Sequence, residues 1–178
     1  MSQWVFGYGS LIWRPGFEFL ESHFTTIYGW SRSFSQASPD HRGTPDFPGR
    51  VLTLREELGA QCRGRVYRVS DERWPEVFRY LEHRESGGYR ACRLDVDTGE
   101  RTTKAWVWIA LPDNPHSVPN ESVESTVEVM LTAHGQSGPN IDYVLNLECA
   151  LEEAGISDAE VVRYAKLLRQ YVSESSSD

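Results

Sequence analysis

The chain has 178 residues, of which 39% are hydrophobic, 12% aromatic and 25% charged, and this composition excludes the disordered and fibrous classes. The formal net charge of -8, from 18 basic and 26 acidic residues, lacks the basic surface that nucleic-acid binding requires, so we expect a small-molecule substrate. No apolar run approaches the ~20 residues of a membrane-spanning helix, and the start Met1-Ser2-Gln3-Trp4 lacks the features of a signal peptide, which predicts a cytoplasmic protein with no membrane partner.

The length fits one domain, because domains cluster near about 100–200 residues. We therefore predict a single domain over residues 1–178, with a disordered polar tail at 173–178. Cys62, Cys92 and Cys149 are far apart and form no CxxC pair, so we expect small buried residues in a reducing compartment, and neither nucleophiles nor zinc ligands. The histidines show no HExxH or HxxxH pattern, so no metal site is predicted.

The first predicted element is a short apolar strand at residues 3–7, which a glycine-rich turn at 7–10 ends. Between 24 and 34, aromatic residues alternate with polar ones, and this period of two predicts a strand, bent at Gly29. The segment 38–49 is too rich in proline, glycine and aspartate for regular structure, so we expect a long polar loop.

Two more strands fit at 50–54 and 61–69, and a helix is predicted from near residue 70 to Gly87. A hairpin follows over 89–96 and 101–111, with its turn at 97–100. Helical spacing of apolar residues then predicts three helices, at 123–134, at 141–155 and from the capping box of Ser157 and Glu160 onward. In the last helix we expect four buried residues, Val161, Val162, Leu167 and Leu168. Strands come first and helices last, which predicts an α+β fold whose sheet curls into a small barrel.

The turn Gly7-Tyr8-Gly9-Ser10 is one of two features that could carry chemistry. Successive backbone N–H groups in such a turn can converge on one point and bind a carboxylate or a developing oxyanion. Many glycine turns only reverse the chain, so the motif alone does not decide between the two roles.

Glu85 is the second feature. The apolar face of the helix consists of Trp74, Val77, Phe78 and Leu81, and at about 100° per residue Glu85 lies about 20° from Trp74 on that face. Burial and the negative end of the helix dipole should raise the pKa of this carboxyl group, as a general base needs. Alternatively, the helix ends before Glu85, and its carboxylate is a solvated charge.

Other candidates lie in the loops and at a helix start. Arg42 and His41, in the polar loop, could bind an anionic substrate, although loop arginines are commonly just solvated. Tyr143, close to a helix start at Asn140, fits either an edge of the core or the wall of a pocket.

Five separated blocks occur in order along nearly the whole chain. They are Val5-Phe-Gly-Tyr-Gly-Ser-Leu-Ile-Trp13, Ser38-Pro-Asp-His-Arg-Gly-Thr-Pro45, Pro48-Gly-Arg-Val51, Leu81-Glu-His-Arg-Glu-Ser-Gly-Gly-Tyr89 and Ser137-Gly-Pro-Asn-Ile-Asp-Tyr143. Together they closely resemble the ChaC family of glutathione-specific γ-glutamylcyclotransferases. The resemblance implies a γ-glutamylcyclotransferase-like fold, a small mixed β-barrel with flanking helices. It also implies conversion of glutathione to 5-oxoproline and cysteinylglycine, without a metal or organic cofactor.

The same resemblance places the catalytic glutamate of the family on Glu85. The expected substrate-binding residues are Val5, Phe6, Gly7, Tyr8, Gly9, Ser10, Leu11, Arg42 and Tyr143. One departure lies at 114–118, where the family has an Asn-x-x-Tyr-like stretch and this chain reads Asn114-Pro-His-Ser-Val118, without the tyrosine.

The implied chemistry agrees with the two features found in the residues. The α-amine of a γ-glutamyl amide can reach its own γ-carbonyl carbon, and Glu85 would move the protons while the turn binds an anionic group. Two alternatives stay open at this stage: a cyclotransferase acting on another γ-glutamyl amine or dipeptide, and a non-catalytic module that binds γ-glutamyl compounds.

Overall fold

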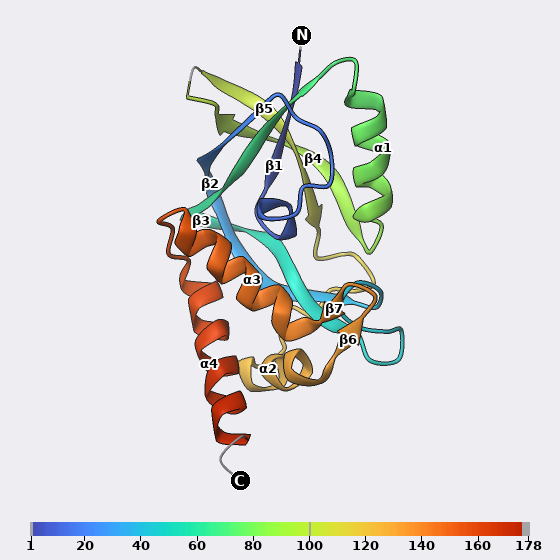
Figure 1. Ribbon diagram of the computed structural model, residues 1–178, viewed down its shortest axis with the longest axis vertical. Coiled ribbons are helices and arrows are strands. Elements are labelled where there is room, and N and C mark those ends of the chain that lie inside the picture. The colour runs from blue at the N-terminus through green and yellow to red at the C-terminus, as the bar shows by residue number, and fades with distance from the viewer. Residues whose placement is uncertain (1, 100, 176–178) are drawn as a thin grey trace. The chain divides into compact units, whose positions relative to one another are not determined.

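A computed structural model describes residues 2–99 and 101–175 of the chain (Figure 1). These residues form a five-stranded sheet, a two-stranded sheet and four α-helices. They divide into two compact units, one of residues 1–31 and 54–115 and the other of residues 32–53 and 116–178. Each unit is described by itself, and the single domain predicted from the length stays a prediction.

The five-stranded sheet has the order β2-β3-β1-β5-β4. Its strands are β1 (Ser2–Gly7), β2 (Glu21–Ser38), β3 (Gly49–Ser70), β4 (Tyr89–Asp97) and β5 (Thr102–Ala110). The central strand β1 pairs antiparallel with β3 and parallel with β5 at Val5, so it has a neighbour on both sides. This placement buries Val5 and Phe6 almost completely. The predicted strand at 3–7 and the predicted hairpin are therefore confirmed, although Glu100 of the hairpin turn lies outside the described residues.

The α+β class is confirmed, but the sheet is open and does not form the expected barrel. Closure would require the edge strands β2 and β4 to pair with each other. No such pairing occurs among the residues described. Strand β1 is the middle strand of the five, so it lies away from both edges of the sheet.

Strands β2 and β3 are longer than the patterns predicted. The two strands expected at 50–54 and 61–69 are one continuous strand, β3, because the polar residues between them are exposed but still extended. The expected bend at Gly29 corresponds to a φ of +79°, a conformation that glycine adopts without the steric cost of a side chain.

Helix α1 (Trp74–Arg84) covers the sheet of the first unit (Figure 1). Its buried residues Val77 and Leu81 belong to a core cluster that also contains Val5, Leu11, Tyr67, Val69 and Trp108. The amphipathic spacing seen in the sequence thus selects the face that packs on the sheet. Because Leu11 is part of this core, the turn after β1 is anchored by apolar burial.

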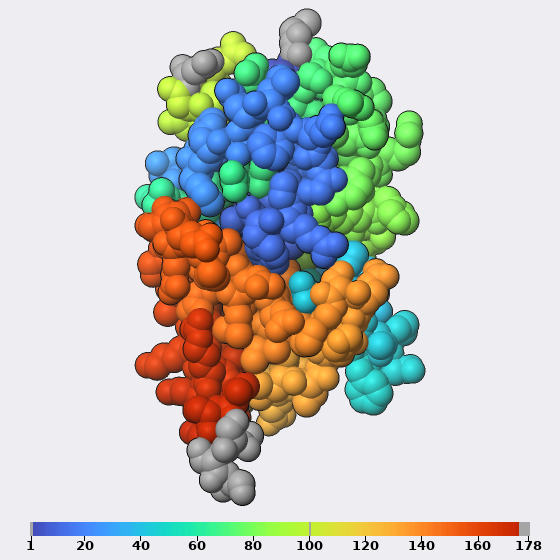
Figure 2. All heavy atoms as spheres, in the orientation of Figure 1, coloured from blue at the N-terminus to red at the C-terminus, as the bar shows by residue number. Residues whose placement is uncertain are grey.

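The second unit contains three helices, α2 (Val123–Thr132), α3 (Asn140–Glu153) and α4 (Ala159–Ser175). The short strands β6 (His134–Gly135) and β7 (Gly138–Pro139) form a hairpin between α2 and α3, so the prediction that His134 is helical was wrong. In Figure 2 the loop before β3, drawn in cyan, projects beside the orange residues of this hairpin. None of the described helices is long and apolar enough to cross a bilayer.

Several details of α4 and α3 differ from the predictions. Asp158, and not Ser157, caps α4, since its carboxylate accepts a hydrogen bond from the Val161 N–H at 3.2 Å. Val162 is exposed and Leu167 is only partly buried, contrary to the prediction, whereas Tyr164 and Ala165 are buried on the packed face. Helix α4 continues to Ser175, so the first half of the predicted disordered tail is helical, and residues 176–178 lie outside the described part.

The three cysteines are free thiols with different surroundings. Cys62 is fully buried and Cys92 is half-buried, as a small apolar residue would be. Cys149 is exposed on α3, contrary to the prediction, because its position turns away from the packed face of the helix. The neighbouring Glu153 carboxylate raises the pKa of the Cys149 thiol, so this thiol is a poor nucleophile.

Candidate functional site

The glycine turn begins where β1 ends, and close packing explains its first glycine. A Cβ atom on Gly7 would lie 2.6 Å from the Cβ atom of Leu11, which is too close for any real contact. Gly64 of the neighbouring strand lies equally near, because its own Cβ atom would be 2.5 Å from the Gly7 carbonyl oxygen. Two glycines therefore allow the chain to turn back against the sheet within a very small space.

A single turn of 3-10 helix, η1 (Ser10–Ile12), follows the glycines. Its internal hydrogen bonds use the N–H groups of Ile12 and Arg14, which donate to the carbonyl oxygens of Gly9 and Ser10 at 2.9 Å. The N–H groups of Ser10 and Leu11 come first in the turn and have no acceptor within it. They are candidates among the backbone donors of the glycine turn, and binding of an anionic group stays a prediction.

Two tyrosines fix this turn to the sheet. The Tyr8 side chain is buried, and its hydroxyl donates to the Trp108 carbonyl oxygen on β5 at 2.8 Å. The Tyr67 hydroxyl on β3 donates to the Leu11 carbonyl oxygen. Burial raises the pKa of Tyr67 to about 12, against smaller opposing effects of two nearby arginines, so this hydroxyl stays protonated and remains a donor.

Glu85 lies at the C-terminal end of α1. It is the residue after the last helical one, with φ −97° and ψ 23°, and its N–H donates to the Leu81 carbonyl oxygen at 2.9 Å. The helix thus ends before Glu85, as the alternative interpretation had it. The carboxylate is nevertheless not a solvated charge, because only 18% of the side chain is exposed and Oε1 lies 3.5 Å from Nε of Arg84. A raised pKa for Glu85 stays a prediction.

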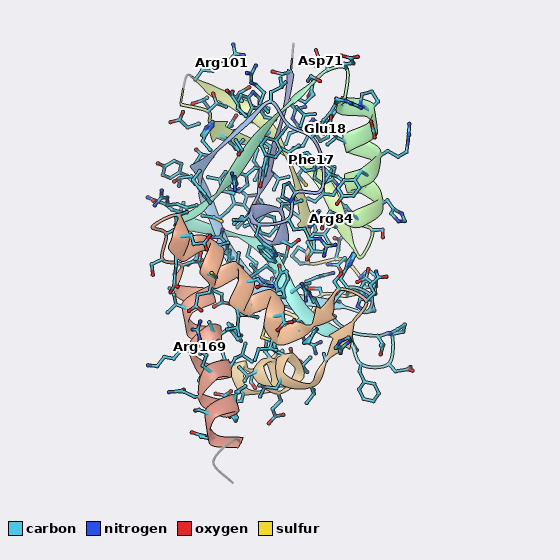
Figure 3. All side chains as sticks on the ribbon, viewed as in Figure 1. Phe17, Glu18, Asp71, Arg84, Arg101 and Arg169 are labelled. Carbon is cyan, nitrogen blue, oxygen red and sulfur yellow. The ribbon has the colours of Figure 1, made fainter. Side chains whose placement is uncertain are left out.

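Arg84, which is labelled in Figure 3, links this carboxylate to the glycine turn, and no sequence pattern predicted it. Its Nη2 donates to Ser10 Oγ at 2.8 Å, and its Nη1 lies 2.7 Å from the Arg14 carbonyl oxygen and 2.9 Å from that of Pro15. The turn and the end of α1 are therefore joined by one side chain. The one feature of the sequence that could have indicated Arg84 is its position directly before Glu85 in the family-like block of residues 81–89.

The second unit contains the other predicted substrate-binding residues, Arg42 and Tyr143, and brings these two together. The Arg42 guanidinium lies 5.6 Å from the centre of the Tyr143 ring, and its Nη1 donates to the Pro139 carbonyl oxygen at 3.0 Å. Arg42 is 8% exposed, so it is not the solvated loop arginine that was the alternative. Tyr143 is 7% exposed, which fits both an edge of the core and the wall of a pocket. Phe34 also packs against Tyr143, edge to face.

Hydrogen bonds and close packing fix the conformation of the loop that carries Arg42. The N–H of Arg42 donates to Ser38 Oγ at 3.1 Å, and the N–H of Ser137 donates to the His41 carbonyl oxygen at 2.9 Å. A Cβ atom on Gly43 would lie 2.2 Å from the Gly49 nitrogen, so the two ends of the loop approach closely. His41 contributes to this fixation, because its Nδ1 lies 3.1 Å from Ser137 Oγ.

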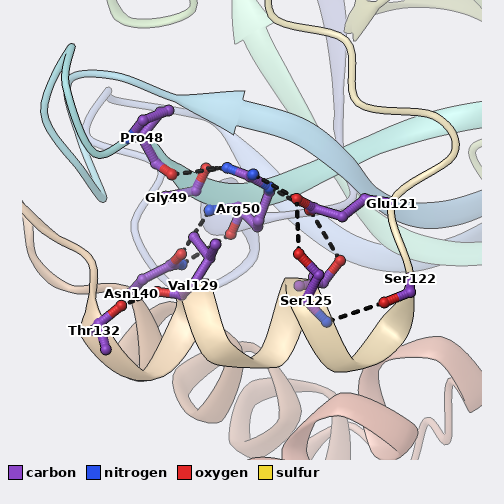
Figure 4. Close-up of polar contacts among 10 residues, drawn as sticks. Pro48, Gly49, Arg50, Glu121, Ser122, Ser125, Val129, Thr132 and Asn140 are labelled. Atoms are coloured by element: carbon purple, nitrogen blue, oxygen red, sulfur yellow. Dashed lines mark hydrogen bonds and ion pairs between the residues drawn. The ribbon is translucent and has the colours of Figure 1, made fainter.

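A buried polar network holds the end of this loop (Figure 4). Arg50 donates from Nε and Nη2 to both oxygens of Glu121, at 2.5 and 2.7 Å, and from Nη1 to the Pro48 carbonyl oxygen at 2.7 Å. The hydrogen bonds from Arg50 hold the pKa of Glu121 below its ordinary value, although burial opposes them. Asn140, fully buried, pairs with both backbone groups of Arg50, accepting at 2.6 Å and donating at 2.8 Å.

The segment at 114–118 is where the sequence departs from the family pattern, and its residues 116–118 pair with the part of β2 that lies in the second unit. Ser117 forms a bridge with Gln36, the His116 carbonyl oxygen accepts from the Ala37 N–H at 2.8 Å, and the Val118 N–H donates to Ser35.

Groups of three or more histidine, cysteine or acidic side chains that could hold a metal do not occur among the described residues. The first unit offers a shielded carboxylate and backbone amides, and the second unit offers a buried arginine beside an aromatic ring.

Comparison with known proteins gives the family. The family described as ChaC-like protein matches residues 3–172, which is most of the chain. The chain belongs to the ChaC-like protein family. Glu85, the glycine turn, Arg42 and Tyr143 all lie inside the matched region.

Several relatives of this ChaC-like chain carry related names. It is 40% identical over 184 aligned positions to γ-glutamylcyclotransferase 2-3 of Arabidopsis thaliana, covering 98% of this chain and 92% of the relative. It is 35% identical over 157 positions to glutathione-specific γ-glutamylcyclotransferase 1 of Homo sapiens, covering 85% and 71%. It is 37% identical over 159 positions to the glutathione-specific γ-glutamylcyclotransferase of Escherichia coli K12, covering 87% and 68%.

The fold agrees with this family. A crystal structure of the yeast γ-glutamylcyclotransferase specific to glutathione superimposes with a TM-score of 0.89 at 29% identity, covering 96% of each chain. The expected γ-glutamylcyclotransferase-like fold is therefore confirmed, with an open sheet in place of the barrel.

Proposed function

We propose that this ChaC-like chain cleaves glutathione by intramolecular cyclotransfer, forming 5-oxoproline and L-cysteinylglycine, with Glu85 as the general acid and base. The reaction is that of relatives named as glutathione-specific γ-glutamylcyclotransferases, which match most of the chain. The observation that carries the role of Glu85 is a mostly shielded carboxylate next to the arginine that binds the glycine turn.

The reaction needs neither water nor a redox partner. The α-nitrogen of the γ-glutamyl group attacks its own γ-carbonyl carbon, a new C–N bond closes a five-membered ring, and the bond to the cysteine nitrogen breaks. Two protons leave the α-ammonium group and two reach the departing nitrogen, so the overall charge is unchanged. Binding the substrate in the folded conformation supplies much of the entropy cost of ring closure in advance.

Proton transfer is the task left to a side chain, because an ammonium group has no lone pair with which to attack. Glu85 accepts a proton from the α-nitrogen and delivers one to the leaving nitrogen. A positioned general base is worth about 10²–10⁴ in rate. A carboxylate shielded from water suits this exchange, because little solvent competes for the protons that it moves.

The turn supplies the complementary positive potential. The N–H groups of Ser10 and Leu11 bind an anionic oxygen of the substrate, either the α-carboxylate or the oxyanion that develops at the γ-carbon. The hydroxyl of Tyr67 and the Tyr8 side chain hold these donors in place from the sheet. Such donors cost no reorganisation during the reaction, because they are fixed before substrate binds.

We assign Arg42 to a substrate carboxylate and Tyr143 to the orientation of Arg42. A chain with a net charge of -8 needs a local positive group for an anionic substrate such as glutathione. The ring of Tyr143 and the carbonyl oxygen of Pro139 restrict the Arg42 guanidinium, so less freedom is lost on binding.

The test of the mechanism is Glu85→Gln, which keeps the shape of the side chain and removes its basicity. We expect 5-oxoproline formation from glutathione to fall by about 10²–10⁴-fold. Thermal unfolding of the same preparation supplies the folded fraction, because the substitution also removes the ion pair with Arg84. The matched control is Glu76→Gln, since Glu76 is an exposed residue of the same helix that pairs with Arg73. Turnover by Glu85→Gln close to the wild-type rate would contradict the role of this carboxylate.

A binding module without catalysis is distinguished by calorimetry combined with mass analysis. Wild-type protein that binds glutathione but leaves it intact would support that alternative. The formation of 5-oxoproline and cysteinylglycine in equal amounts supports the enzyme.

Substrate range is a separate question, because the relative from Arabidopsis thaliana is named γ-glutamylcyclotransferase without mention of glutathione. The altered segment at 114–118 also lies where the family has a tyrosine. We expect kcat/KM for glutathione to exceed that for γ-glutamyl-alanine. Equal values would show that the enzyme acts on γ-glutamyl amides in general.

The cytoplasmic location and the absence of a nucleic-acid partner stay predictions. The free thiols of Cys62, Cys92 and Cys149 support a reducing compartment, and the acidic charge supports a small-molecule substrate.

A further inference from the structure

One guanidinium group in the first unit contacts an unusual number of functional neighbours. Arg84 donates from Nη2 to Ser10 Oγ, and its Nη1 lies within 2.9 Å of three oxygen atoms: the carbonyl oxygens of Arg14 and Pro15 and the hydroxyl of Tyr80. Its Nε lies 3.5 Å from Glu85 Oε1. The side chain is only 13% exposed, so these contacts replace most of its hydration.

The loop after η1 is shaped to meet this group. Gly16 has a φ of +74°, and a Cβ atom there would lie 2.2 Å from the Tyr80 hydroxyl and 3.4 Å from Nη1 of Arg84. Only glycine therefore lets the loop close over the last turn of α1. The Arg84 guanidinium also lies 5.9 Å from the centre of the Tyr80 ring, which restricts it from the side of the helix.

We propose that Arg84 is a positioning residue, which holds the glycine turn of residues 7–11 and the Glu85 carboxylate at the separation that ring closure needs. This inference rests on the proposed function. Arg84 is not assigned to substrate, since the donors described here are engaged with Ser10, Arg14, Pro15 and Tyr80. It acts through the groups it holds.

The chemistry of arginine explains why no other residue serves here. A guanidinium presents several N–H donors in one rigid plane, so it can reach a hydroxyl and two carbonyl oxygens while an edge faces a carboxylate. A lysine at the same place would keep the charge but offer one compact donor group. A misplacement of about 1 Å between reacting groups can cost about 10²-fold in rate.

The experiment compares Arg84→Ala and Arg84→Lys with wild type, by 5-oxoproline release from glutathione. We expect kcat to fall by about 10²-fold for Arg84→Ala, and by less for Arg84→Lys, with a smaller change in KM. The matched control is Arg79→Ala, because Arg79 is an exposed arginine of the same helix. Its kcat should equal that of wild type.

Chemical rescue separates positioning from a loss of folded protein. Millimolar guanidinium chloride, far below denaturing concentrations, should raise the kcat of Arg84→Ala several-fold and leave wild type and Arg79→Ala unchanged. Thermal unfolding of each variant supplies the folded fraction. A fall in kcat that matches the loss of folded protein, with no rescue, overturns the proposal.

A double-mutant cycle tests the contact through which Arg84 acts. Ser10→Ala removes one partner of Arg84, so the double variant should lose little more kcat than Arg84→Ala alone. If the fold-losses of kcat in the two single variants multiply in the double variant, Ser10 and Arg84 act independently and the proposed linkage is wrong. Wild-type protein that forms no 5-oxoproline contradicts the proposed function, whereas an active wild type with Arg84→Ala within about twofold of it contradicts only this inference.

Discussion

Gly7→Ala tests whether the position of the turn controls catalysis. Gly7 is the last residue of β1, and its missing side chain faces Leu11 on the next turn. The added methyl group would lie 2.6 Å from the Leu11 Cβ atom, whereas contacts become ordinary only at 3.4 Å. Leu11 is in the core cluster and cannot swing aside, so the turn itself must move by about 0.8 Å.

That movement should lower both the free energy of unfolding and kcat/KM. Forcing an extra carbon into a packed core costs about 1–3 kcal/mol of unfolding free energy. For a chain of this length, each kcal/mol lowers the melting temperature by about 2–4 °C. A shift approaching 1 Å in the N–H groups of Ser10 and Leu11 should also lower kcat/KM by about 10²-fold.

The assay measures kcat/KM for glutathione and thermal unfolding on the same preparations. Gly59→Ala is the matched control, because Gly59 has a φ of +82° and nothing lies within 4 Å of an added Cβ atom. That control should lose about 1–2 kcal/mol of stability through its backbone conformation and keep full activity. If Gly7→Ala retains the wild-type kcat/KM, the turn is not part of the catalytic geometry.

Two further predictions concern pH and stability. The pKa of Glu121 is lowered by Arg50 in the folded chain, so its stabilising contribution is present above the ordinary value of 4.5 and is lost as the pH falls through the lower folded value. Urea unfolding of wild type and Glu121→Gln should be measured at neutral and at acidic pH. The free energy of unfolding of the variant should be lower than that of wild type at neutral pH and should fall less on acidification. An equal dependence of the two free energies on pH would disprove the role of the Glu121 pKa. The pKa of Tyr67 is raised from 10.0 to about 12, so the unfolded chain ionises first and stability should fall as the pH rises above 10. Tyr67→Phe should remove this alkaline loss, and at neutral pH it should cost about 1–3 kcal/mol because the Leu11 carbonyl oxygen loses its buried donor, as thermal unfolding would show.

Local patterns predicted the elements that depend on neighbours in sequence. The apolar spacing of Trp74, Val77, Phe78 and Leu81 identified α1 and the face that it buries. The same spacing extended to Glu85 located a shielded carboxylate, although the helix ends one residue earlier. The spacing did not predict the partner of this carboxylate, which is the Arg84 guanidinium.

Local sequence patterns did not predict the contacts between segments that are far apart in the chain. Residues 55–60, which lay between the two expected strands, continue β3, because exposed residues in a strand need no apolar alternation. Arg84 and Ser10 are 74 positions apart, and Asn140 and Arg50 are 90 positions apart. No spacing rule predicts which carbonyl or hydroxyl oxygen a side chain will reach across that separation.

The sequence by itself determined the α+β class, the acidic character, the glycine turn and the glutamate that follows α1, since each depends on composition or on a period within one segment. Only the tertiary structure decided that the sheet is open, that Arg42 packs against the Tyr143 ring, and that Arg84 binds the turn beside Glu85. The reason is physical: secondary structure follows local backbone and side-chain preferences, whereas the partner of a buried charge is selected by which distant groups the folded core brings within hydrogen-bond distance.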